Sequence, residues 1–491
     1  MKSISKSNSI LLIIIFFIFS WNIWLKYPLW NDELLSISNV RDNFINNILE
    51  DWHPPLYFFI LKIWTLLFGS SEFILRLLSL IFGLLSIFLL NIYLRKFNSI
   101  KYYSVFGFYI TNWTLFYYSH EVRMYSLLIL LSLIVTIQFE QRVINKKKYI
   151  SYYFFLYFLS LTHFIGLIYA GSLLLIEFIK KIRSKEVFKI IIIGVFLLIY
   201  PLFHFIYNFL YFEKNRAKLQ FINFKQLPEN ISFKFNQFLE CNFKLLHEFF
   251  TFIDVVYLNA TLLFFVFLFL ILSILKSSST NKKIQLIYFF IILIVLLSLF
   301  ILDLSSNIYN YVILLPVISL YFGEIINQQY KILNFNKKFS SLIIILILFY
   351  FIGSFSISYT KMIRKWSGSG TFAGTSNILS VTKNCDPYCL FFDNQNKYKK
   401  LISNMYINQV NYHTVYSFNE LLIENNIIFP IILNYPSQSQ LNYLKNNYTN
   451  WRCYILSKSF FDNLVIYLPP DHNKPNFIEH SKKWHLQKSC F

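Results

Sequence analysis

Over the first 360 residues, long apolar runs alternate with short polar segments that are rich in lysine and arginine. A membrane-spanning helix needs about 20 mostly apolar residues, or somewhat fewer when it is tilted or flanked by snorkelling side chains. The pattern therefore predicts an α-helical polytopic membrane protein with about 11 transmembrane helices. The predicted spans are residues 8–26, 73–94, 102–119, 124–141, 149–163, 164–180, 187–208, 252–275, 284–303, 310–327 and 339–358.

Three places in this pattern need a separate interpretation. Two of the spans are short and meet at Thr162-His163. The segment 54–69 is apolar but shorter, begins with Pro-Pro and contains Lys62, which predicts an interfacial helix rather than a span. The first run follows two lysines, but it is long and no small-x-small cleavage site follows it. A retained signal anchor is therefore favoured over a cleaved signal peptide.

Composition supports the membrane class. Hydrophobic residues make up 56% of the 491 residues and charged residues 14%, with a mean hydropathy of +0.50. Soluble domains carry roughly a quarter charged residues. Soluble multidomain, disordered, collagen-like and small disulfide-rich classes are thereby excluded.

Lysine and arginine in the short loops predict the orientation. With the N-terminus in the cytoplasm, twenty of the 45 Lys and Arg residues lie in short inner loops and five in short outer segments. The rest lie in a long outer loop and the C-terminal tail, and long segments are translocated regardless of charge. The net charge of +21 is therefore mainly a topology signal. This excludes nucleic acid as a partner and indicates a multi-pass protein of the plasma (inner) membrane.

This topology divides the chain into two predicted domains. Residues 1–360 form the transmembrane domain, with a first outer loop at 27–72 and a long outer loop at 209–251. Residues 361–491 form an extracytoplasmic tail, in which short apolar runs alternate with polar, helix-compatible stretches. That alternation predicts a small α/β domain. The strand candidates are residues 389–393, 414–418, 427–433, 453–456 and 464–468.

All five cysteines fall on the outer side in this topology, and the tail contains Cys385, Cys389, Cys453 and Cys490. An oxidising compartment allows disulfides there. Four cysteines allow three pairings, and the sequence does not choose among them. A single C-x3-C without a matching second pair is weak evidence for zinc. No cofactor or metal is therefore expected, and a divalent metal is left open.

Carboxylates gather in the first outer segment, where six of the 24 acidic residues lie between positions 32 and 72. Asp32-Glu33 follows the first span directly, and scarce acids beside a membrane surface indicate a site. Adjacent residues on a helix point about 100° apart, so one carboxylate suits a general base and the other an orienting or binding role. The alternative is a solvated loop that balances Arg41 and Lys62.

Two further groups follow along the chain. His53 precedes Pro54-Pro55, whose restricted backbone holds His53 at a defined depth relative to the membrane surface. Arg76 opens the second predicted span. It either snorkels as an interface anchor or binds a lipid phosphate bidentately.

The turn 117–126 brings His120, Glu121, Arg123 and Tyr125 together between two apolar helices. Ionisable residues at such a turn are either interface anchors or the lining of a cavity. His163 marks the next outer turn, where a satisfied polar residue is the favoured interpretation.

Together these groups supply a carboxylate base and several cations beside the lipid. Such a set suits transfer of a group from a lipid phosphate to an acceptor hydroxyl. The base takes the acceptor proton, and the cations neutralise the departing phosphate. The sequence contains neither G-x-x-x-x-G-K-[ST] nor G-x-G-x-x-G. A lipid-linked donor needs no such nucleotide-binding motif.

Four motifs carry a family resemblance, and they occur in this order: N-D-E at 31–33, H-P-P-L-Y at 53–57, S-E-F-I-L-R-L-L-S-L-I-F-G at 71–83 and S-H-E-V-R-M-Y at 119–125. With them the chain resembles the GT-C glycosyltransferases. The group it is most similar to comprises bacterial polytopic transferases related to protein O-mannosyltransferases and to the aminoarabinose transferase of lipid A. The resemblance covers about 25–165 and extends in pattern to Y-N-Y-V-I-L-L-P at 309–316. The tail is not covered.

The resemblance implies a polyprenyl-phosphate-sugar donor, an extracytoplasmic active site and inversion at C1. It implies Asp32 as catalytic base and Glu33 as a second acidic position at the site. It further implies donor- or substrate-binding roles for His53, Arg76, His120, Glu121, Arg123 and Tyr125. Two positions depart from the family pattern: Asn310 stands where a basic residue is common, and His53 where some relatives have lysine.

The predicted function is that of a membrane glycosyltransferase acting on an extracytoplasmic glycan, lipid or protein acceptor. One alternative is a transporter or flippase of lipid-linked sugars, which needs ionisable residues near the midplane of several spans. A second is a non-catalytic relative in cell-envelope glycan assembly. An O-antigen polymerase or ligase is a neighbouring enzymatic alternative.

Overall fold

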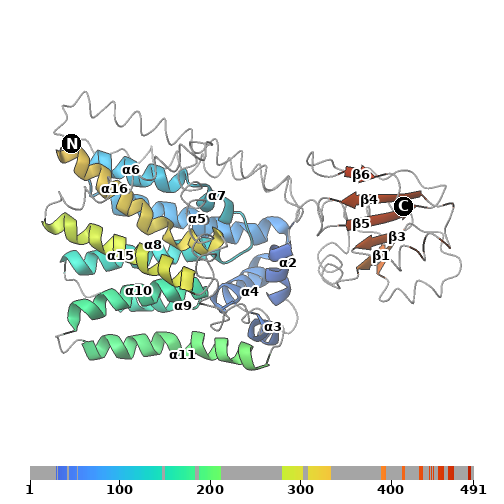
Figure 1. The fold of residues 1–491 in the computed structure, drawn as a ribbon, viewed down its shortest axis with the longest axis horizontal. Coiled ribbons are helices and arrows are strands. Elements are labelled where there is room, and N and C mark those ends of the chain that lie inside the picture. Colours follow the sequence, from blue (N-terminus) through green and yellow to red (C-terminus); the bar gives the residue numbers. More distant parts are fainter. Residues whose placement is uncertain are drawn as a thin grey trace, which may run out of the picture. The chain divides into compact units, whose positions relative to one another are not determined.

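The computed structural model describes most of the predicted transmembrane domain and the strands of the tail (Figure 1). The described residues are 29, 31–40, 44–51, 53–145, 150–182, 187–211, 279–301 and 308–332, together with six strands and a few neighbouring residues between 389 and 487. They fall into two compact units, one built from 1–24 and Asn39–Thr360 and the other from 25–38 and 361–491, so that one boundary lies within a helix, between Ser38 and Asn39. The first unit is helical, and the second contains the sheet.

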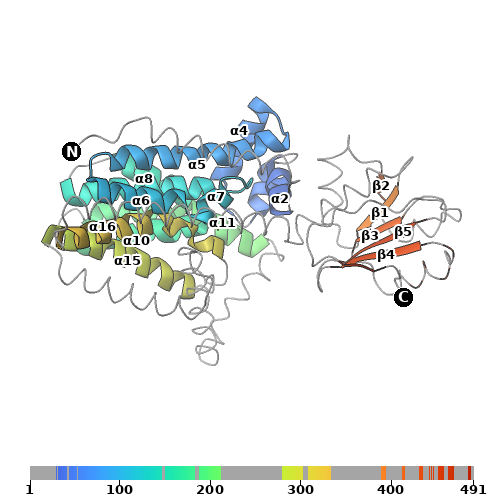
Figure 2. The same cartoon turned by 90° about the horizontal axis from the view of Figure 1, so that it is seen from above.

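The long helices of the first unit lie side by side in the two perpendicular views (Figures 1 and 2), whereas α2 belongs mostly to the second unit. In chain order, the helical elements of the described residues are α2 (Asn31–Val40), α3 (Phe44–Glu50), α4 (Leu56–Phe68), α5 (Glu72–Leu94), α6 (Ser99–Ile110), α7 (Trp113–Tyr118), α8 (Tyr125–Asn145), α9 (Ile150–Ser160), α10 (Phe164–Lys181), α11 (Val187–Tyr211), α15 (Ser279–Ile301), the 3-10 helix η2 (Ile308–Leu314) and α16 (Leu315–Ile332).

Most predicted spans that fall on described residues coincide with helices, since hydrophobic periodicity is a local signal. Among the described residues, two segments, Glu72–Leu94 and Tyr311–Gln328, are long and apolar enough to cross a membrane by length and composition. The span predicted at 310–327 begins as a 3-10 helix and becomes α-helical at Leu315. Spans 8–26, 252–275 and 339–358 lie outside the described residues, so the number of spans stays a prediction.

One predicted span is wrong: residues 102–119 form two helices, α6 and α7. The break falls at Asn112, whose side-chain Oδ1 accepts a hydrogen bond from the Thr114 N–H at 3.0 Å and so caps α7. Thr111 donates its hydroxyl back to the carbonyl oxygen of Gly107 at 2.8 Å. An asparagine cap competes with a continuous helix, a signal that a hydropathy window does not register.

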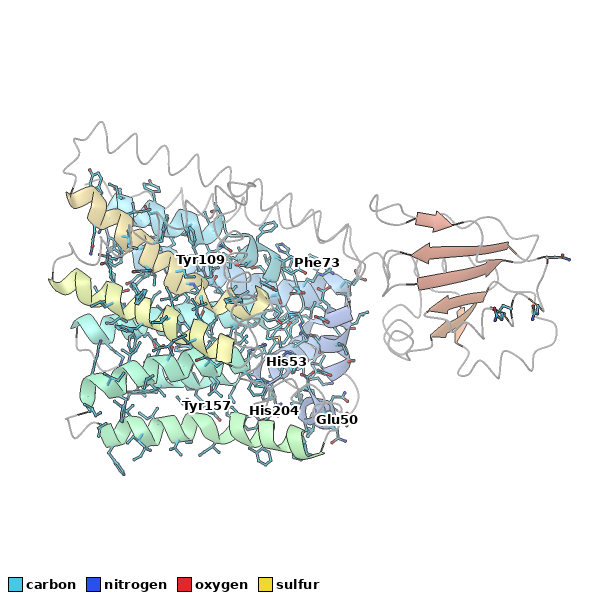
Figure 3. The ribbon with its side chains drawn as sticks, in the orientation of Figure 1. Glu50, His53, Phe73, Tyr109, Tyr157 and His204 are labelled. Atoms are coloured by element: carbon cyan, nitrogen blue, oxygen red, sulfur yellow. The ribbon has the colours of Figure 1, made fainter. Side chains whose placement is uncertain are left out.

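Turns and helix ends of the first unit meet at two ends: the His53 ring lies 5.2 Å from the His163 ring at one, and Asn98 bonds to Asn327 at 2.5 Å at the other. One end contains the turns before α4, between α7 and α8, and between α9 and α10, and we call it the His53 end. The other contains the turn between α5 and α6 and the ends of α8, α10 and α16, and we call it the Lys101 end. Figure 3 labels Glu50, His53, Phe73 and His204 toward the His53 end.

Two glycines allow close packing near the His53 end. A Cβ atom at Gly83 of α5 would lie 2.1 Å from the Ser119 hydroxyl oxygen. One at Gly166 of α10 would lie 2.1 Å from the carbonyl oxygen of Leu159 in α9. Neither approach is open to a residue with a side chain. The glycines thus bring the turns after α7 and α9 against the neighbouring helices.

Helix α4 is apolar on its exposed side, where Ile63, Leu66, Leu67 and Phe68 are all more than half exposed. Trp64 fastens it to α5 by donating its indole N–H to the carbonyl oxygen of Ile74 at 2.7 Å. The helix predicted at 54–69 is confirmed. Its position at a membrane interface stays a prediction.

The second unit contains a six-stranded mixed sheet with strand order β2-β1-β3-β5-β4-β6. The strands are β1 (Cys389–Asp393), β2 (Tyr412–Thr414), β3 (Ile431–Asn434), β4 (Arg452–Ser457), β5 (Asn463–Leu468) and β6 (His485–Gln487). Strand β1 is parallel to β2 and β3, and the remaining pairs are antiparallel. Four of the five predicted strands are found. The strand predicted at 414–418 meets β2 at Thr414, and residues 415–418 lie outside the described residues. Strand β6 has no counterpart among the predicted strands, and a complete α/β domain stays a prediction.

The sheet order excludes one of the three disulfide pairings. Cys389 lies in β1 and Cys453 in β4, and β3 and β5 separate these strands. Three strand spacings place the two backbones about 14 Å apart, whereas a disulfide needs Cα atoms within about 7 Å. A Cys389–Cys453 bond is therefore incompatible with the fold.

Candidate active site

Asp32 and Glu33 open helix α2, where a negative charge is favoured by the helix dipole. The structure separates the two acids: the Glu33 side chain is buried, at 1% exposure, and Asp32 is partly exposed. Ser36 donates its hydroxyl to the backbone carbonyl oxygen of Asp32 at 3.0 Å. Both acids belong to the unit that contains the sheet, and the other candidate residues belong to the helical unit.

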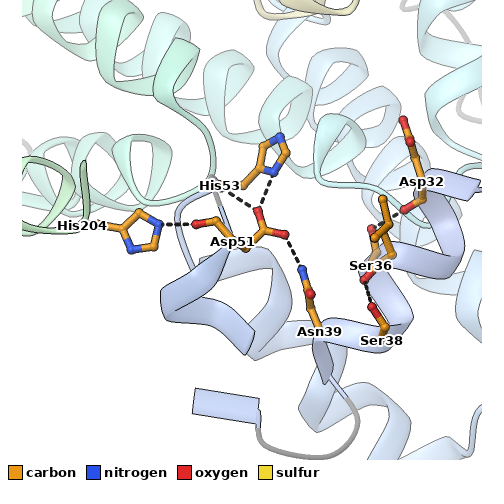
Figure 4. A network of polar contacts seen from close by, with 8 residues as sticks. Asp32, Ser36, Ser38, Asn39, Asp51, His53 and His204 are labelled. Carbon is orange, nitrogen blue, oxygen red and sulfur yellow. Dashed lines mark hydrogen bonds and ion pairs between the residues drawn. The ribbon is translucent and has the colours of Figure 1, made fainter. Parts of the chain in front are cut away.

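A tight turn between α3 and α4 presents His53. The Asp51 Oδ1 atom accepts two bonds from this residue, each 2.7 Å long, one from the backbone N–H and one from ring Nδ1 (Figure 4). A carboxylate that bonds an N–H two residues on is a common turn device. Pro54 and Pro55 then lead into α4, and the Leu56 N–H donates to the carbonyl oxygen of Leu161 at 3.1 Å.

Other elements also hold the Asp51 residue. Asn39 of α2 donates its amide to Oδ2, and His204 of α11 donates its Nε2–H to the backbone carbonyl oxygen at 3.0 Å (Figure 4). Burial by itself would raise the pKa of the Asp51 carboxyl. The His53 charge, the bonds from His53 and the more distant Arg123 charge outweigh burial and hold that pKa well below its usual range. Asp51 is therefore a carboxylate at neutral pH.

His163 lies beside this pair, with its ring centroid 5.2 Å from that of His53. Its Nδ1 accepts the Ile165 N–H at 3.1 Å and so caps α10. Burial, the His53 charge and the Arg123 charge lower the pKa of His163 well below its usual value. A buried imidazole whose Nδ1 accepts a hydrogen bond is neutral, so His163 supplies no positive charge here.

The turn between α7 and α8 contains His120, Glu121 and Arg123, and Tyr125 opens α8; all four are buried. His120 donates Nδ1–H to the carbonyl oxygen of Phe116 at 2.5 Å. Burial lowers the pKa of His120 to about 3, and the Arg76 charge acts in the same direction. Arg123 is 7% exposed, and its guanidinium carbon lies 5.9 Å from the Tyr125 ring centroid.

Arg76 is fully buried in the second turn of α5. A buried guanidinium does not snorkel to an interface, so the anchor interpretation does not fit. A buried cation requires compensating negative charge. The Arg76 charge acts on His120, so Arg76 lies near the turn that also contains Glu121 and Arg123.

The His163 ring links His53 to the turn after α7. Its centroid lies 5.2 Å from that of His53 and 5.9 Å from that of Tyr125, and Tyr125 in turn lies beside Arg123. Arg76 lies near His120. The sequence alone indicates no role for Asp51 or His204, and at His163 it favours a satisfied polar residue. A local signal existed for Asp51, because D-x-H-P-P has the spacing of a carboxylate-capped turn. For His204 the only signal was an ionisable group in an apolar helix.

Among the described residues, no three His, Cys, Asp or Glu side chains lie close enough together to hold a metal ion. That the protein has no cofactor stays a prediction, and a divalent metal is left open.

No protein-family model and no curated protein sequence matches the chain. Two solved structures do match its fold: ArnT from Cupriavidus metallidurans bound to undecaprenyl phosphate, and the same protein in the apo state. The TM-scores are 0.56 and 0.55, and the identities 11% and 12%; in each case the match covers 94% of this chain and 98% of the other. The chain has the fold of ArnT. ArnT is an aminoarabinose transferase of the GT-C type, so the fold agrees with the resemblance carried by the four motifs.

Proposed function

We propose that the protein is a membrane glycosyltransferase that transfers a sugar from a polyprenyl-phosphate-linked donor to an extracytoplasmic acceptor, with inversion at C1. The observation that carries the proposal is the ArnT fold along 94% of the chain, because that match includes a structure with bound undecaprenyl phosphate. The buried Arg76 and Arg123 support it, since a lipid phosphate needs cations where water is scarce.

The proposed topology has a cytoplasmic N-terminus and an extracytoplasmic tail in the plasma (inner) membrane. The basic residues of the short loops support this orientation. It assigns the His53 end to the outer face and the Lys101 end to the cytoplasmic face. The apolar exposed side of α4 then lies in the outer interface.

In the proposed reaction, Asp32 takes the proton of the acceptor hydroxyl. The hydroxyl oxygen forms a bond to C1 of the sugar, and the bond between C1 and the phosphate oxygen breaks. The electron pair leaves with the polyprenyl phosphate, whose charge His53, Arg76 and Arg123 neutralise. Asp32 suits the base better than Glu33, because Asp32 is partly exposed and Glu33 is buried.

The test is transfer of radiolabelled sugar from a panel of synthetic polyprenyl-phosphate donors by protein in lipid vesicles. Asp32→Asn keeps the shape of the side chain but removes its basicity, so kcat should fall by roughly 10²–10⁴. Donor binding should remain near normal. Glu33→Gln serves as the matched control and should have a smaller effect.

Near-normal turnover of Asp32→Asn together with an inactive Glu33→Gln would reverse the assignment of the base. Passage of intact labelled donor across the vesicle membrane, with no polyprenyl phosphate released, would favour a transporter instead.

A further inference from the structure

The strand order of the second unit limits which cysteines of the tail can meet. Cys389 opens β1 and Cys453 is the second residue of β4, and three strand spacings separate these strands (Figure 1). Cys385 and Cys490 lie outside the described residues, but the length of chain limits how far each can be from a strand. Cys385 lies four residues before Cys389, and Cys490 lies three residues after Gln487, the last residue of β6.

A bond between Cys389 and Cys490 is out of reach. Four strand spacings, or about 19 Å, separate β1 from β6. An extended chain spans at most about 3.5 Å per residue, so the three residues after Gln487 cover about 10 Å. At least about 9 Å then remains between the two Cα atoms, whereas a disulfide needs less than about 7 Å. Because Cys389 cannot bond to Cys453 either, its remaining partner in the tail is Cys385.

The ladder between β4 and β6 instead brings Cys490 within reach of Cys453. These strands are antiparallel, with Ile455 opposite Gln487. Cys453 lies two residues before Ile455, on the side of the ladder toward which β6 runs. Opposed Cα atoms are about 5 Å apart and each residue along a strand adds about 3.4 Å, so Cys453 lies about 8 Å from Gln487. Three residues are enough to cover that distance.

Cys385 and Cys389 are close in the sequence, with Asp-Pro-Tyr between them. Asp-Pro favours the start of a turn, and a β-turn brings Cα atoms three residues apart within about 7 Å. A bond between two cysteines four residues apart is therefore open to this segment. When all four cysteines of the tail are joined, the sheet leaves this bond and the bond of Cys453 with Cys490 as the one complete pairing.

We infer that the tail contains two disulfide bonds, Cys385–Cys389 and Cys453–Cys490, and that the second fixes the C-terminal strand β6 to the sheet. Strand β6 contains three residues, and three residue pairs connect it to β4. A covalent bond just beyond this short ladder holds the strand in place. The inference rests on the extracytoplasmic position of the tail in the proposed function, because disulfides persist in an oxidising compartment.

Each bond forms when two thiols lose two protons and two electrons and their sulfur atoms join. The acceptor is the disulfide of an extracytoplasmic thiol oxidase, which takes up the same protons and electrons and becomes a dithiol. Cys241, in the predicted outer loop 209–251, is the fifth cysteine. Both bonds together use the four cysteines of the tail, so we expect Cys241 to stay a thiol.

The experiment maps the bonds in the full chain by mass spectrometry. Iodoacetamide blocks free thiols before the cells are lysed, and the protein is purified without reductant, unfolded and digested with trypsin. The expected products are peptide 453–458 joined to peptide 489–491, and peptide 384–397 lighter by two hydrogen atoms because of its internal bond. Peptide 235–244, which contains Cys241, should carry the alkyl group and serves as the internal control.

Other products contradict the inference. Both alternative pairings join peptide 384–397 to peptides 453–458 and 489–491, so any such product would overturn it. Alkylated Cys453 or Cys490 in the wild type, or a bond from either to Cys241, would overturn it as well.

Thermal unfolding provides a second measurement. Cys453→Ser, Cys490→Ser and the double variant should lower the unfolding temperature by the same amount, on the order of 10 °C, because each removes the same constraint on the unfolded chain. A reductant should lower the wild type to the temperature of the double variant. Cys241→Ser is the matched control and should leave the unfolding temperature unchanged. Additive losses in the two single variants would show that the cysteines act separately and would contradict the bond.

The outcomes separate this inference from the proposed function. If both bonds are present but no donor of the panel is turned over, the disulfides stand and the transfer reaction fails. If sugar is transferred but all five cysteines are alkylated, the reaction stands and the disulfide assignment fails.

Discussion

The two ends of the helical unit use charged residues in different ways. At the Lys101 end, ionic and polar bonds join helices that are distant in sequence: Lys101 bonds to Glu324 at 2.6 Å, and Tyr288 donates to Glu140. At the His53 end, the ion pair of Asp51 with His53 joins residues two positions apart. A long-range pair fastens helices to one another, whereas a local pair orients one side chain.

Neighbouring contacts support the distinction. At the Lys101 end, Arg142 bonds to both oxygens of Glu177 at 3.2 and 3.4 Å, and Gln285 donates to Gln328 at 2.9 Å. Each of these pairs links two helices. At the His53 end, His120 and His163 bond to backbone groups four and two residues away, respectively. We therefore expect variants at the Lys101 end to change stability and variants at the His53 end to change donor handling.

The largest expected effect comes from breaking the buried ion pair at the Lys101 end. Lys101→Met leaves Glu324 buried without its cation, so the free energy of unfolding should fall by about 3–5 kcal/mol. Thermal unfolding in detergent measures this loss. The double variant Lys101→Met with Glu324→Leu removes both charges and should recover most of the stability. If the single variant unfolds at the wild-type temperature, the pair of Lys101 with Glu324 does not stabilise the helices, and the contrast between the two ends fails.

Next in size is the loss of a cation near the His53 end. Arg76→Ala and Arg123→Ala should each lower kcat/KM for the donor roughly tenfold or more, as expected when a charge-assisted contact of about 1.5–3 kcal/mol is lost. Arg142→Ala is the matched control, because it removes the same residue type from the Lys101 end. It should lower stability but leave kcat/KM within about twofold. If Arg76→Ala and Arg123→Ala both show normal donor kinetics, these arginines have a structural role and do not bind the donor.

The smallest effect concerns His163, which the structure assigns to capping rather than to chemistry. His163→Ala should lower the free energy of unfolding by about 0.5–2 kcal/mol, the usual range for a lost N-cap. His163→Asn keeps a capping side chain and should recover most of that loss with little change in transfer. If His163→Asn folds normally and yet loses activity, the imidazole itself takes part in the reaction.

Much of the helical pattern could be predicted, because the apolar residues that bury a helix lie close together in the sequence. The helices at 72–94, 125–145 and 164–181 follow directly from their apolar runs. The failure at 102–119 has a definite cause, since Asn112 adds little to a hydropathy average yet caps a new helix. The candidate site can be predicted in part from the sequence. Arg76 and residues 119–125 lie within recognisable motifs, whereas Asp51 lies outside the motif that begins at His53.

The class of the protein, most of its helical segments and the residue types available for chemistry can be predicted from the chain, because they depend on composition and on neighbours within a few positions. Which charges join helices and which orient a side chain emerges only after folding. The partner of Lys101 lies 223 residues away, and the backbone of Asp51 is held by a histidine 153 residues away. No local pattern encodes such partners, because they meet only when the helices pack.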